Sequence, residues 1–168
     1  MPKGRAYRSF NNYIDISREY YAAHGYDKPY AWAYNHDVPF ANLEKPVSQC
    51  RIALVTTTDL AKPPGENLQE RHKARKVFAH PSDEAPEHFF TKDLRWDYET
   101  THTDDNESFM PLDRLVECVA DGTIGSVSSR FYGVMTDYSQ SRASKKSAPQ
   151  ILEFCREDGV DAVFLPAL

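Results

Sequence analysis

Apolar residues along the chain form short runs whose spacing changes from one segment to the next. The segment "RIALVTTTDL" (51–60) has a continuous apolar run over residues 52–55, followed by three threonines and an aspartate. This pattern predicts a buried parallel strand that ends in a polar loop. The segment "DAVFL" contains a second continuous run, over residues 162–165. Because neither run alternates with polar residues, we expect two central, neighbouring strands of one parallel sheet.

Three other segments have the helical spacing of apolar residues. The first covers residues 5–23 and ends at Gly25, the second begins at Pro111, and the third begins at Pro149. Proline suits the first turn of a helix, and a glycine after the last turn is a typical helix end. The remaining patterns predict strands over residues 94–98 and 128–135 and a polar loop over residues 139–147.

The order of these elements predicts an α/β fold: a mostly parallel open sheet with flanking helices, in a Rossmann-like or flavodoxin-like three-layer arrangement. Residues 1–49 are expected to form an N-terminal helix and an arm rich in proline and aromatic residues. This arm packs either on its own core or on a sister subunit. Residues 50–168 form the α/β domain, with a loop-rich insertion at residues 61–92. Within this insertion, "LQERHKARKVF" (68–78) predicts a short solvated helix.

Composition narrows the class of protein. The chain has 168 residues and a formal net charge of -5 at pH 7, which suits one domain and gives no reason to expect a nucleic-acid partner. The sequence has no run of about 18 apolar residues and no apolar signal-peptide region at its N-terminus, so we expect a cytoplasmic protein without a membrane segment. Three scattered cysteines, Cys50, Cys118 and Cys155, predict inert thiols rather than a disulfide framework.

The segment "THTDDN" (101–106) is the strongest candidate for chemistry. His102 next to Asp104 suits general acid–base catalysis, because a nearby carboxylate holds the pKa of a histidine near neutral. A metal bound by His102 with one or both aspartates is an alternative. In a third interpretation, Asp104 or Asp105 caps or turns the chain into the helix that follows.

This segment follows a predicted strand, so it is expected at the same sheet edge as the threonines that end the strand at residues 51–60. Ligands of open α/β sheets bind at that edge. We assign catalysis to His102 and Asp104 and substrate binding to Thr57, Thr58, Asp105 and Tyr138, with no residue assigned to a metal.

Three blocks of the sequence, taken in order, resemble a known family. They are "RIALVTTTDL" (51–60), "HTDDNESFMPLDRLVECVADGTIGSVSSRFYGVM" (102–135) and "APQILEFCREDGVDAVFLPAL" (148–168). A histidine–aspartate stretch, a PLDRL helix, an IG turn and a GVDAV strand follow one another as in the selenoprotein B family of glycine, sarcosine, betaine and D-proline reductases. The order and spacing of the blocks carry the resemblance, which spans residues 51–168.

The resemblance implies an oxidoreductase subunit that takes part in reductive C–N bond cleavage of a small amine-type substrate. In larger members of the family, a pyruvoyl group of a partner subunit activates the substrate as a Schiff base. A selenocysteine just after the GVDAV strand then attacks the carbon next to nitrogen. The implied partners are a small-molecule substrate and either partner reductase subunits or further copies of the chain. No cofactor is expected within the chain, and a selenocysteine is expected in a longer native product.

The sequence stops at Leu168, just before the position at which the resemblance places that selenocysteine. An apolar strand such as "AVFLPAL" is expected to continue into a loop and a helix that cover the sheet. We therefore expect a truncated product, with Leu168 followed by a UGA codon that is read as selenocysteine or by a cysteine-containing redox loop. Two alternatives remain open: a non-catalytic binding or assembly module of the same fold, and a metal-dependent enzyme centred on His102.

Overall fold

The computed structural model describes residues 12–26, 28, 36–38, 41–60, 77–90, 104–134 and 139–166. The chain divides into two units, Met1–Pro39 and Phe40–Leu168. The first unit contains helix α2 (Asn12–Ala23), and Gly25 follows it with a φ of 79°, a left-handed conformation that glycine adopts without strain. The predicted first helix is thus confirmed over its described residues. Residues 5–11 and most of the aromatic arm lie outside the described part of the chain.

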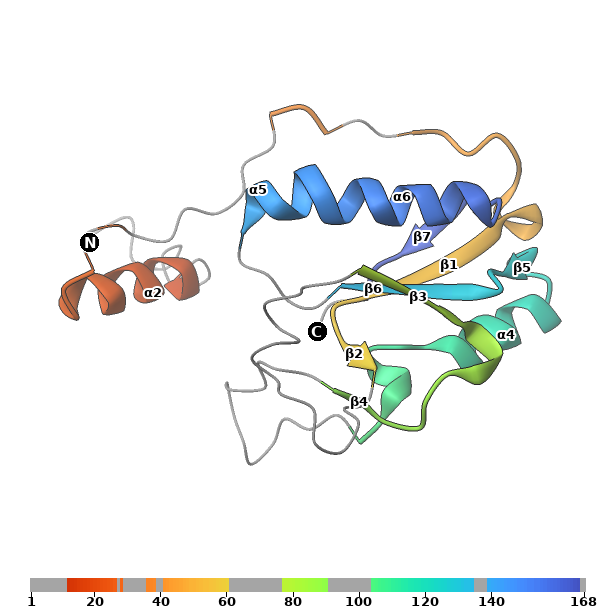
Figure 1. Cartoon of the computed structure of the whole chain (residues 1–168), viewed down its shortest axis with the longest axis horizontal. Coiled ribbons are helices and arrows are strands. Elements are labelled where there is room, and N and C mark those ends of the chain that lie inside the picture. Colours follow the sequence, from red (N-terminus) through yellow and green to blue (C-terminus); the bar gives the residue numbers. More distant parts are fainter. Residues whose placement is uncertain are drawn as a thin grey trace, which may run out of the picture. The chain divides into compact units, whose positions relative to one another are not determined.

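The second unit is built on a five-stranded sheet (Figure 1). Its strands are β1 (Arg51–Thr56), β3 (Val77–Pro81), β5 (Ser126–Val127), β6 (Arg130–Val134) and β7 (Ala162–Phe164). β1 pairs in parallel with β5 and then β6 along one edge, and in parallel with β7 along the other. β3 pairs antiparallel with β6. The sheet is therefore mostly parallel, as predicted.

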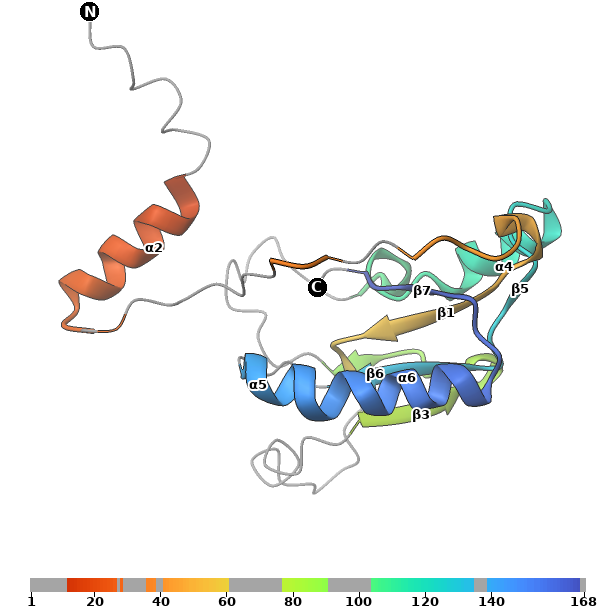
Figure 2. The same cartoon turned by 90° about the horizontal axis from the view of Figure 1, so that it is seen from above.

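One helix packs on each face of this sheet, as Figures 1 and 2 show. Helix α4 (Leu112–Ala120) packs against Ile52 and Leu54 of β1, whereas helix α6 (Ala148–Glu157) packs against Ala53 and Val55. Successive side chains of a strand point to opposite faces, so β1 is buried on both sides. This arrangement confirms the predicted α/β class, with helices flanking a mostly parallel sheet.

Close approach of neighbouring segments requires glycine at two positions. Gly125 lies in the turn between α4 and β5, where a Cβ atom would come within 2.6 Å of the carbonyl carbon of Gln49. Gly133 lies directly opposite Phe78 in the β3–β6 ladder, and a Cβ atom there would collide with the Phe78 ring. A larger residue would displace the Gln49 backbone at position 125 or the Phe78 ring at position 133. This is the physical reason for the glycine in the "IG" turn and in the "YG" pair of β6.

The prediction that residues 162–165 form a central strand is wrong. β7 does pair with β1, as expected, but no other described strand pairs with it. Val163 is 36% exposed, Phe164 47% and Leu165 69%. A continuous apolar run indicates that burial is favourable, but the number of neighbouring strands decides how much burial occurs.

Two other predictions need correction. Of the predicted loop at residues 139–147, residues 140–147 are helical: α5 (Gln140–Arg142) and a π-helical turn, η4 (Ala143–Ser147), run directly into α6. Their polar composition is that of an exposed helix surface, which has the same residue types as a loop. Val77 and Phe78 belong to strand β3 and not to a solvated helix.

A two-stranded antiparallel sheet pairs β2 (Asp59–Leu60) with β4 (Phe89–Phe90). The loop-rich insertion therefore contributes β3 and β4, while its residues 61–76 and the strand predicted over residues 94–98 lie outside the described part of the chain. Among the described residues, no helix has the length and apolar character needed to span a membrane.

Candidate functional site

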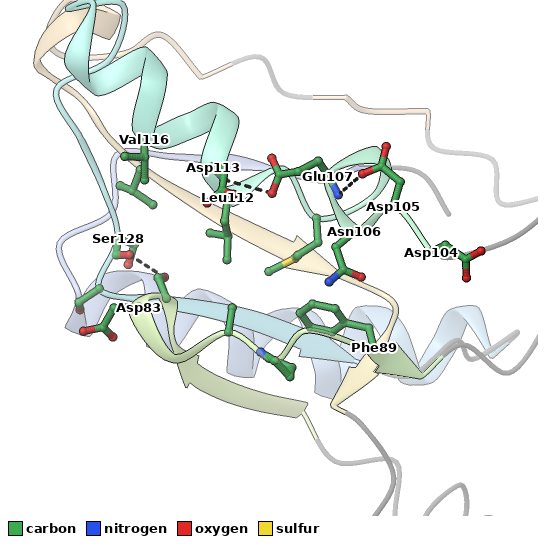
Figure 3. A pocket seen from close by; sticks show the side chains of 16 residues that line it. Asp83, Phe89, Asp104, Asp105, Asn106, Glu107, Leu112, Asp113, Val116 and Ser128 are labelled. Atoms are coloured by element: carbon green, nitrogen blue, oxygen red, sulfur yellow. Dashed lines mark hydrogen bonds between the residues drawn. The ribbon is translucent and has the colours of Figure 1, made fainter.

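A pocket of about 700 Å³ opens on the face of the sheet that α4 covers (Figure 3). One wall is the connection from β3 to β4, and the other is the segment of residues 104–113 that leads into α4. Its acidic lining residues are Asp83, Asp104, Asp105, Glu107 and Asp113. Its apolar lining residues are Ala85, Pro86, Phe89, Met110, Leu112, Val116 and Val127. The pocket thus combines carboxylates with an apolar floor.

The first wall is fixed to the start of β6. Ser82 begins the 3₁₀ helix η2 (Ser82–Glu84), and its backbone N–H donates to Ser129 O at 2.8 Å. The Ser82 hydroxyl donates to Ser128 O, also at 2.8 Å. These two bonds join the wall to the short break between β5 and β6. The break leaves backbone carbonyls without a strand partner, and Ser82 satisfies two of them.

The second wall contains the 3₁₀ helix η3 (Asn106–Ser108), which Asp105 caps. Asp105 Oδ1 accepts from the backbone N–H of Glu107 at 3.0 Å, and Asp105 O accepts from the Ser108 hydroxyl at 2.7 Å. An aspartate at this position satisfies an N–H group that has no partner within the helix. Asp105 is thus a capping residue, but of η3 and not of the helix that begins at Pro111, as the capping interpretation predicted.

Glu107 caps α4 from outside the helix. Its Oε1 accepts from the backbone N–H of Asp113 at 3.2 Å, and its Oε2 accepts from that of Arg114 at 3.1 Å. Pro111, at the helix start, makes no side-chain capping bond, so the first N–H groups of α4 need an acceptor from elsewhere. A carboxylate there also interacts favourably with the positive end of the helix dipole.

Asn106 connects the two walls. Its Nδ2 donates to Glu87 O, on the β3–β4 connection, at 2.6 Å. Its Oδ1 is buried and has no hydrogen-bond partner among the described residues. Figure 3 shows this amide directed into the space between η3 and Phe89. A buried carbonyl-type oxygen without a donor is costly, and each such group in a folded protein calls for an explanation.

The apolar floor is well packed. Phe89 is 8% exposed, Met110 1% and Leu112 9%. The ring of Phe89 contacts the rings of Phe109 and Phe131 edge to face, with centroids 6.0 and 5.9 Å apart, a favourable aromatic geometry. The floor is therefore part of the main hydrophobic core and holds its shape independently of any ligand.

The predicted site residues are only partly brought together. Asp104 and Asp105 line the pocket, whereas Thr57 and Thr58 are not among its described lining residues. Thr57 is exposed after β1, and Thr58 is buried with its hydroxyl 2.7 Å from that of Thr56. His102 and Tyr138 lie outside the described part of the chain, so their roles, and the metal alternative at His102, stay predictions.

Sequence reasoning missed Glu107 and Asp83, and it assigned no role to Asn106, although Asn106 lies in the candidate segment of residues 101–106. The acidic segment before Pro111 did indicate a helix cap, but residue types alone do not distinguish Asp104, Asp105 and Glu107 as the capping group. Asp83 lies in the insertion, whose fold the pattern did not reveal. Among the described residues, no group of three or more His, Cys, Asp or Glu side chains is arranged to hold a metal ion.

The opposite face of the sheet carries a different polar cluster. Arg130 Nε donates to Asp158 Oδ2 at 2.8 Å, and its Nη2 donates to Asp158 Oδ1 at 2.8 Å and to Glu157 Oε2 at 3.0 Å. The hydroxyl of the fully buried Tyr132 donates to Asp158 Oδ2 at 2.6 Å. Together these bonds fasten the end of α6 to β6.

The pKa values of this cluster follow from these contacts. The hydrogen bonds of Arg130 lower the pKa of Asp158, and those of Asp158 raise the pKa of Arg130 further above its ordinary value. Burial raises the pKa of Tyr132, and its bond to Asp158 adds to the effect. The three groups therefore keep fixed protonation states over a wide pH range, as expected for a structural ion pair.

Two of the three cysteines, Cys50 and Cys155, do not resemble activated thiols. Cys155 is 6% exposed, and burial raises its pKa. The Cys50 thiol is buried and lies 3.4 Å from Pro46 O, to which it donates. A reactive thiolate needs a lowered pKa and access to its partner, and neither residue has both. This confirms the prediction of inert thiols for Cys50 and Cys155.

The fold and the site together define the class of protein: an α/β domain with an acid-lined pocket beside its central sheet. The sequence model of the glycine/sarcosine/betaine reductase selenoprotein B (GRDB) family matches residues 21–167. The chain belongs to this family. The match begins in α2 and spans both the aromatic arm and the insertion, a longer range than the three blocks cover. No curated protein and no solved structure gives a significant match.

Proposed function

We propose that this chain is the substrate-binding component of a reductase that cleaves a C–N bond of a small amine. One observation carries the proposal: in a member of the selenoprotein B family, the pocket combines acidic side chains with a packed apolar floor. A carboxylate-rich wall attracts a protonated amine, and an apolar floor accommodates its carbon atoms. Asp104 and Asp105 contribute to substrate binding at this wall.

The redox-active group comes from outside these 168 residues in this proposal. Cys50 and Cys155 are buried and unsuited to nucleophilic attack, and Cys118 packs against the core around Ile52. The family supplies a selenocysteine or cysteine for that step. The chain then holds the amine while a selenol or thiol displaces its nitrogen, with a partner subunit activating the substrate. A selenolate attacks the carbon, so that a C–Se bond forms and the amine leaves with the C–N electron pair. One sulfur of a dithiol then attacks the selenium, and the carbon leaves with the C–Se electron pair and takes a proton. The second thiol breaks the resulting S–Se bond, which gives a disulfide and the free selenol.

A non-catalytic assembly module is the second candidate. The exposed side chains of Phe164 and Leu165 at β7 favour it. One edge of β7 pairs with no other described strand, and an open apolar strand edge is a common interaction surface. In that case the acidic pocket would belong to a protein that has kept the fold without the reaction.

A single assay distinguishes the two candidate functions. The chain is tagged in its native host and purified with its bound partners, and the complex is incubated with a dithiol and with glycine, sarcosine, betaine or a carboxylate-free amine. We expect release of an amine product, measured by chromatography. A complex carrying Asp83→Asn and Asp113→Asn should release less, while Glu153→Gln on α6 should match the unmodified complex. No release from any substrate would exclude the reductase role and favour the assembly module.

A further inference from the structure

We infer that two copies of this chain associate through the outer side of the continuous helix formed by α5, η4 and α6, with the two helices antiparallel. Three features carry this inference: the order of charges along the helix, their alignment on one exposed stripe, and the lack of partners for the inner charges within the described part of the chain. The interface lies on the α6 face of the sheet, opposite the pocket, so it does not depend on the reductase role.

The charges along this helix run opposite to the order that its own dipole favours. Its first half, residues 140–149, has cations and no acid: Arg142, Lys145 and Lys146. Its second half, residues 150–158, has mainly acids: Glu153, Glu157 and Asp158, together with Arg156. A helix dipole is positive at its N-terminus and negative at its C-terminus, so both groups are placed unfavourably in a single copy. An antiparallel second helix brings opposite charges and an opposed dipole to each half.

Four of these charges lie on one side of the helix. The α-helix has 3.6 residues per turn and the π-helical turn η4 is wider, so residues three to four positions apart follow one another along a stripe. This stripe consists of Arg142, Lys146, Gln150, Glu153 and Glu157. Lys146, Gln150 and Glu153 are exposed, whereas Cys155 on the other side packs into the core. The stripe therefore reads basic, neutral and acidic along the exposed side.

The stripe is complementary to a second copy of itself. A twofold axis that crosses it between Pro149 and Gln150 places Lys146 opposite Glu153 of the second copy. The same axis places Arg142 opposite Glu157 of the second copy. Each contact of a twofold interface occurs twice, so all four charges of each stripe meet a charge of opposite sign.

The inner pair of this stripe is available for such contacts. Within the described part of the chain, no hydrogen bond or ion pair engages the side chain of Lys146 or Glu153. Glu157 contacts Arg130 at 3.0 Å, but its side chain is still 54% exposed, and a carboxylate accepts several hydrogen bonds. One exposed ion pair contributes only about 0.2–1 kcal/mol. Several pairs in one line fix the register and direction of two helices.

Apolar side chains on the same face add contact area. Leu152 of α6 is 48% exposed and Val163 of β7 is 36% exposed. Val163 lies opposite Ala53 in the β1–β7 ladder, and Ala53 belongs to the cluster under α6, so Val163 faces the α6 side. Figure 2 shows α5 and α6 as one continuous helix along this side of the sheet. A second copy would remove part of this apolar surface from water.

Sedimentation equilibrium of the full chain at low ionic strength tests the inference. We expect a species of twice the 19.2 kDa of one chain, and added salt should weaken it because exposed ion pairs are screened. Glu153→Lys or Lys146→Glu places like charges opposite one another twice per dimer and should raise the dissociation constant about tenfold. The double variant, Lys146→Glu with Glu153→Lys, restores opposite charges and should recover the original constant. The control Glu84→Lys, on the β3–β4 connection, changes the net charge equally and should have no effect.

Cross-linking tests the register independently. The two copies of position 150 lie beside the twofold axis, whereas the two copies of position 140 are about 30 Å apart along the helices, at a rise of about 1.5 Å per residue. A short bismaleimide should therefore link Gln150→Cys into a covalent dimer. It should not link Gln140→Cys or the unmodified chain, which has three native cysteines.

Circular dichroism confirms that each variant is folded. A chain that stays monomeric at the highest attainable concentration, or a dimer that neither charge reversal weakens, would overturn the inference. So would a folded double variant that fails to recover association, or equal cross-linking at positions 140 and 150. None of these results depends on amine release, so the inference and the reductase role fail separately.

Discussion

The two faces of the central sheet handle polar groups in opposite ways. On the α6 face, Arg130, Tyr132 and Asp158 satisfy one another, and the Asp158 side chain is only 13% exposed. On the α4 face, Asp83 and Asp113 line a pocket, and their carboxylates engage no described residue. The same types of side chain therefore stabilise the fold on one face and remain available for a ligand on the other.

This difference has a physical origin. A buried charge is stable only when it is paired and hydrogen-bonded, so the α6 cluster is closed by necessity. Carboxylates around an open pocket keep their hydration until a ligand displaces the water, so they need no partner within the protein. The exposed or unsatisfied polar groups of the α4 face are therefore better indicators of function than the stronger interactions of the α6 face.

The largest expected effect is that of removing Asp158. Asp158→Ala leaves the Arg130 guanidinium and the Tyr132 hydroxyl without their main acceptor, and we expect the free energy of unfolding to fall by about 3 kcal/mol. Glu157→Ala, which removes the more exposed partner of Arg130, should cost less than about 1 kcal/mol. Urea unfolding at neutral pH measures both. Equal losses in the two variants would contradict the view that Asp158 is the centre of the cluster.

The acid dependence of stability tests the same residue. The folded-state pKa of Asp158 is lowered by Arg130, so its contribution is fully present above the unfolded value of about 3.9. That contribution is lost as the pH falls through the lowered folded value. The free energy of unfolding of the Asp158→Asn variant should therefore fall less than that of the unmodified protein as the pH drops below about 4.

A smaller effect is expected from the tyrosine of this cluster. The folded-state pKa of Tyr132 is raised by burial, so its contribution is present below the unfolded value of about 10 and is lost as the pH rises toward the folded value. Tyr132→Phe should cost about 1 kcal/mol at neutral pH and should remove this alkaline loss. Ultraviolet titration of tyrosinate should reveal one late-titrating group that is missing from the variant. If all tyrosines titrate together in the folded protein, the closed cluster is disproved.

The smallest effect on stability is expected on the α4 face. Asp83→Asn and Asp113→Asn remove charges that no described residue pairs with, so each should change the free energy of unfolding by no more than about 0.5 kcal/mol. Urea unfolding without ligand measures this change. A loss above about 1 kcal/mol in either variant would show that these carboxylates hold the fold, and the contrast between the two faces would then fail.

Patterns that depend on one segment alone were predicted well. The run 52–55 identified β1, and proline and glycine punctuation placed α4 and α6, whose ends are followed by Gly122 and Gly159 at φ of 79° and 63°. Features that depend on a second segment were not predicted. β3 is a strand because β6 lies beside it, and the exposure of β7 depends on the absence of a further described neighbour.

The pocket illustrates the same limit. The acidic segment before α4 was recognised, but its partner wall comes from the insertion, which carried no chemical motif. Glu107 became a cap only because η3 turns its side chain back toward Asp113 and Arg114. Chemistry shared between two segments leaves no spacing rule in the sequence. The contact of Asn106 with Glu87 O and the place of Asp83 in the pocket were therefore found only from the structure.

The position of β1 in the sheet has a consequence during synthesis. Its described strand partners, from Ser126 in β5 to Phe164 in β7, lie far downstream in the sequence. A ribosome adds about 5–20 residues per second, so β1 waits on the order of ten seconds for partners about a hundred residues away. Throughout that interval an apolar strand with two open edges is available to other nascent chains. We therefore expect the yield of folded protein to depend on chaperones and on translation speed more than its equilibrium stability would suggest.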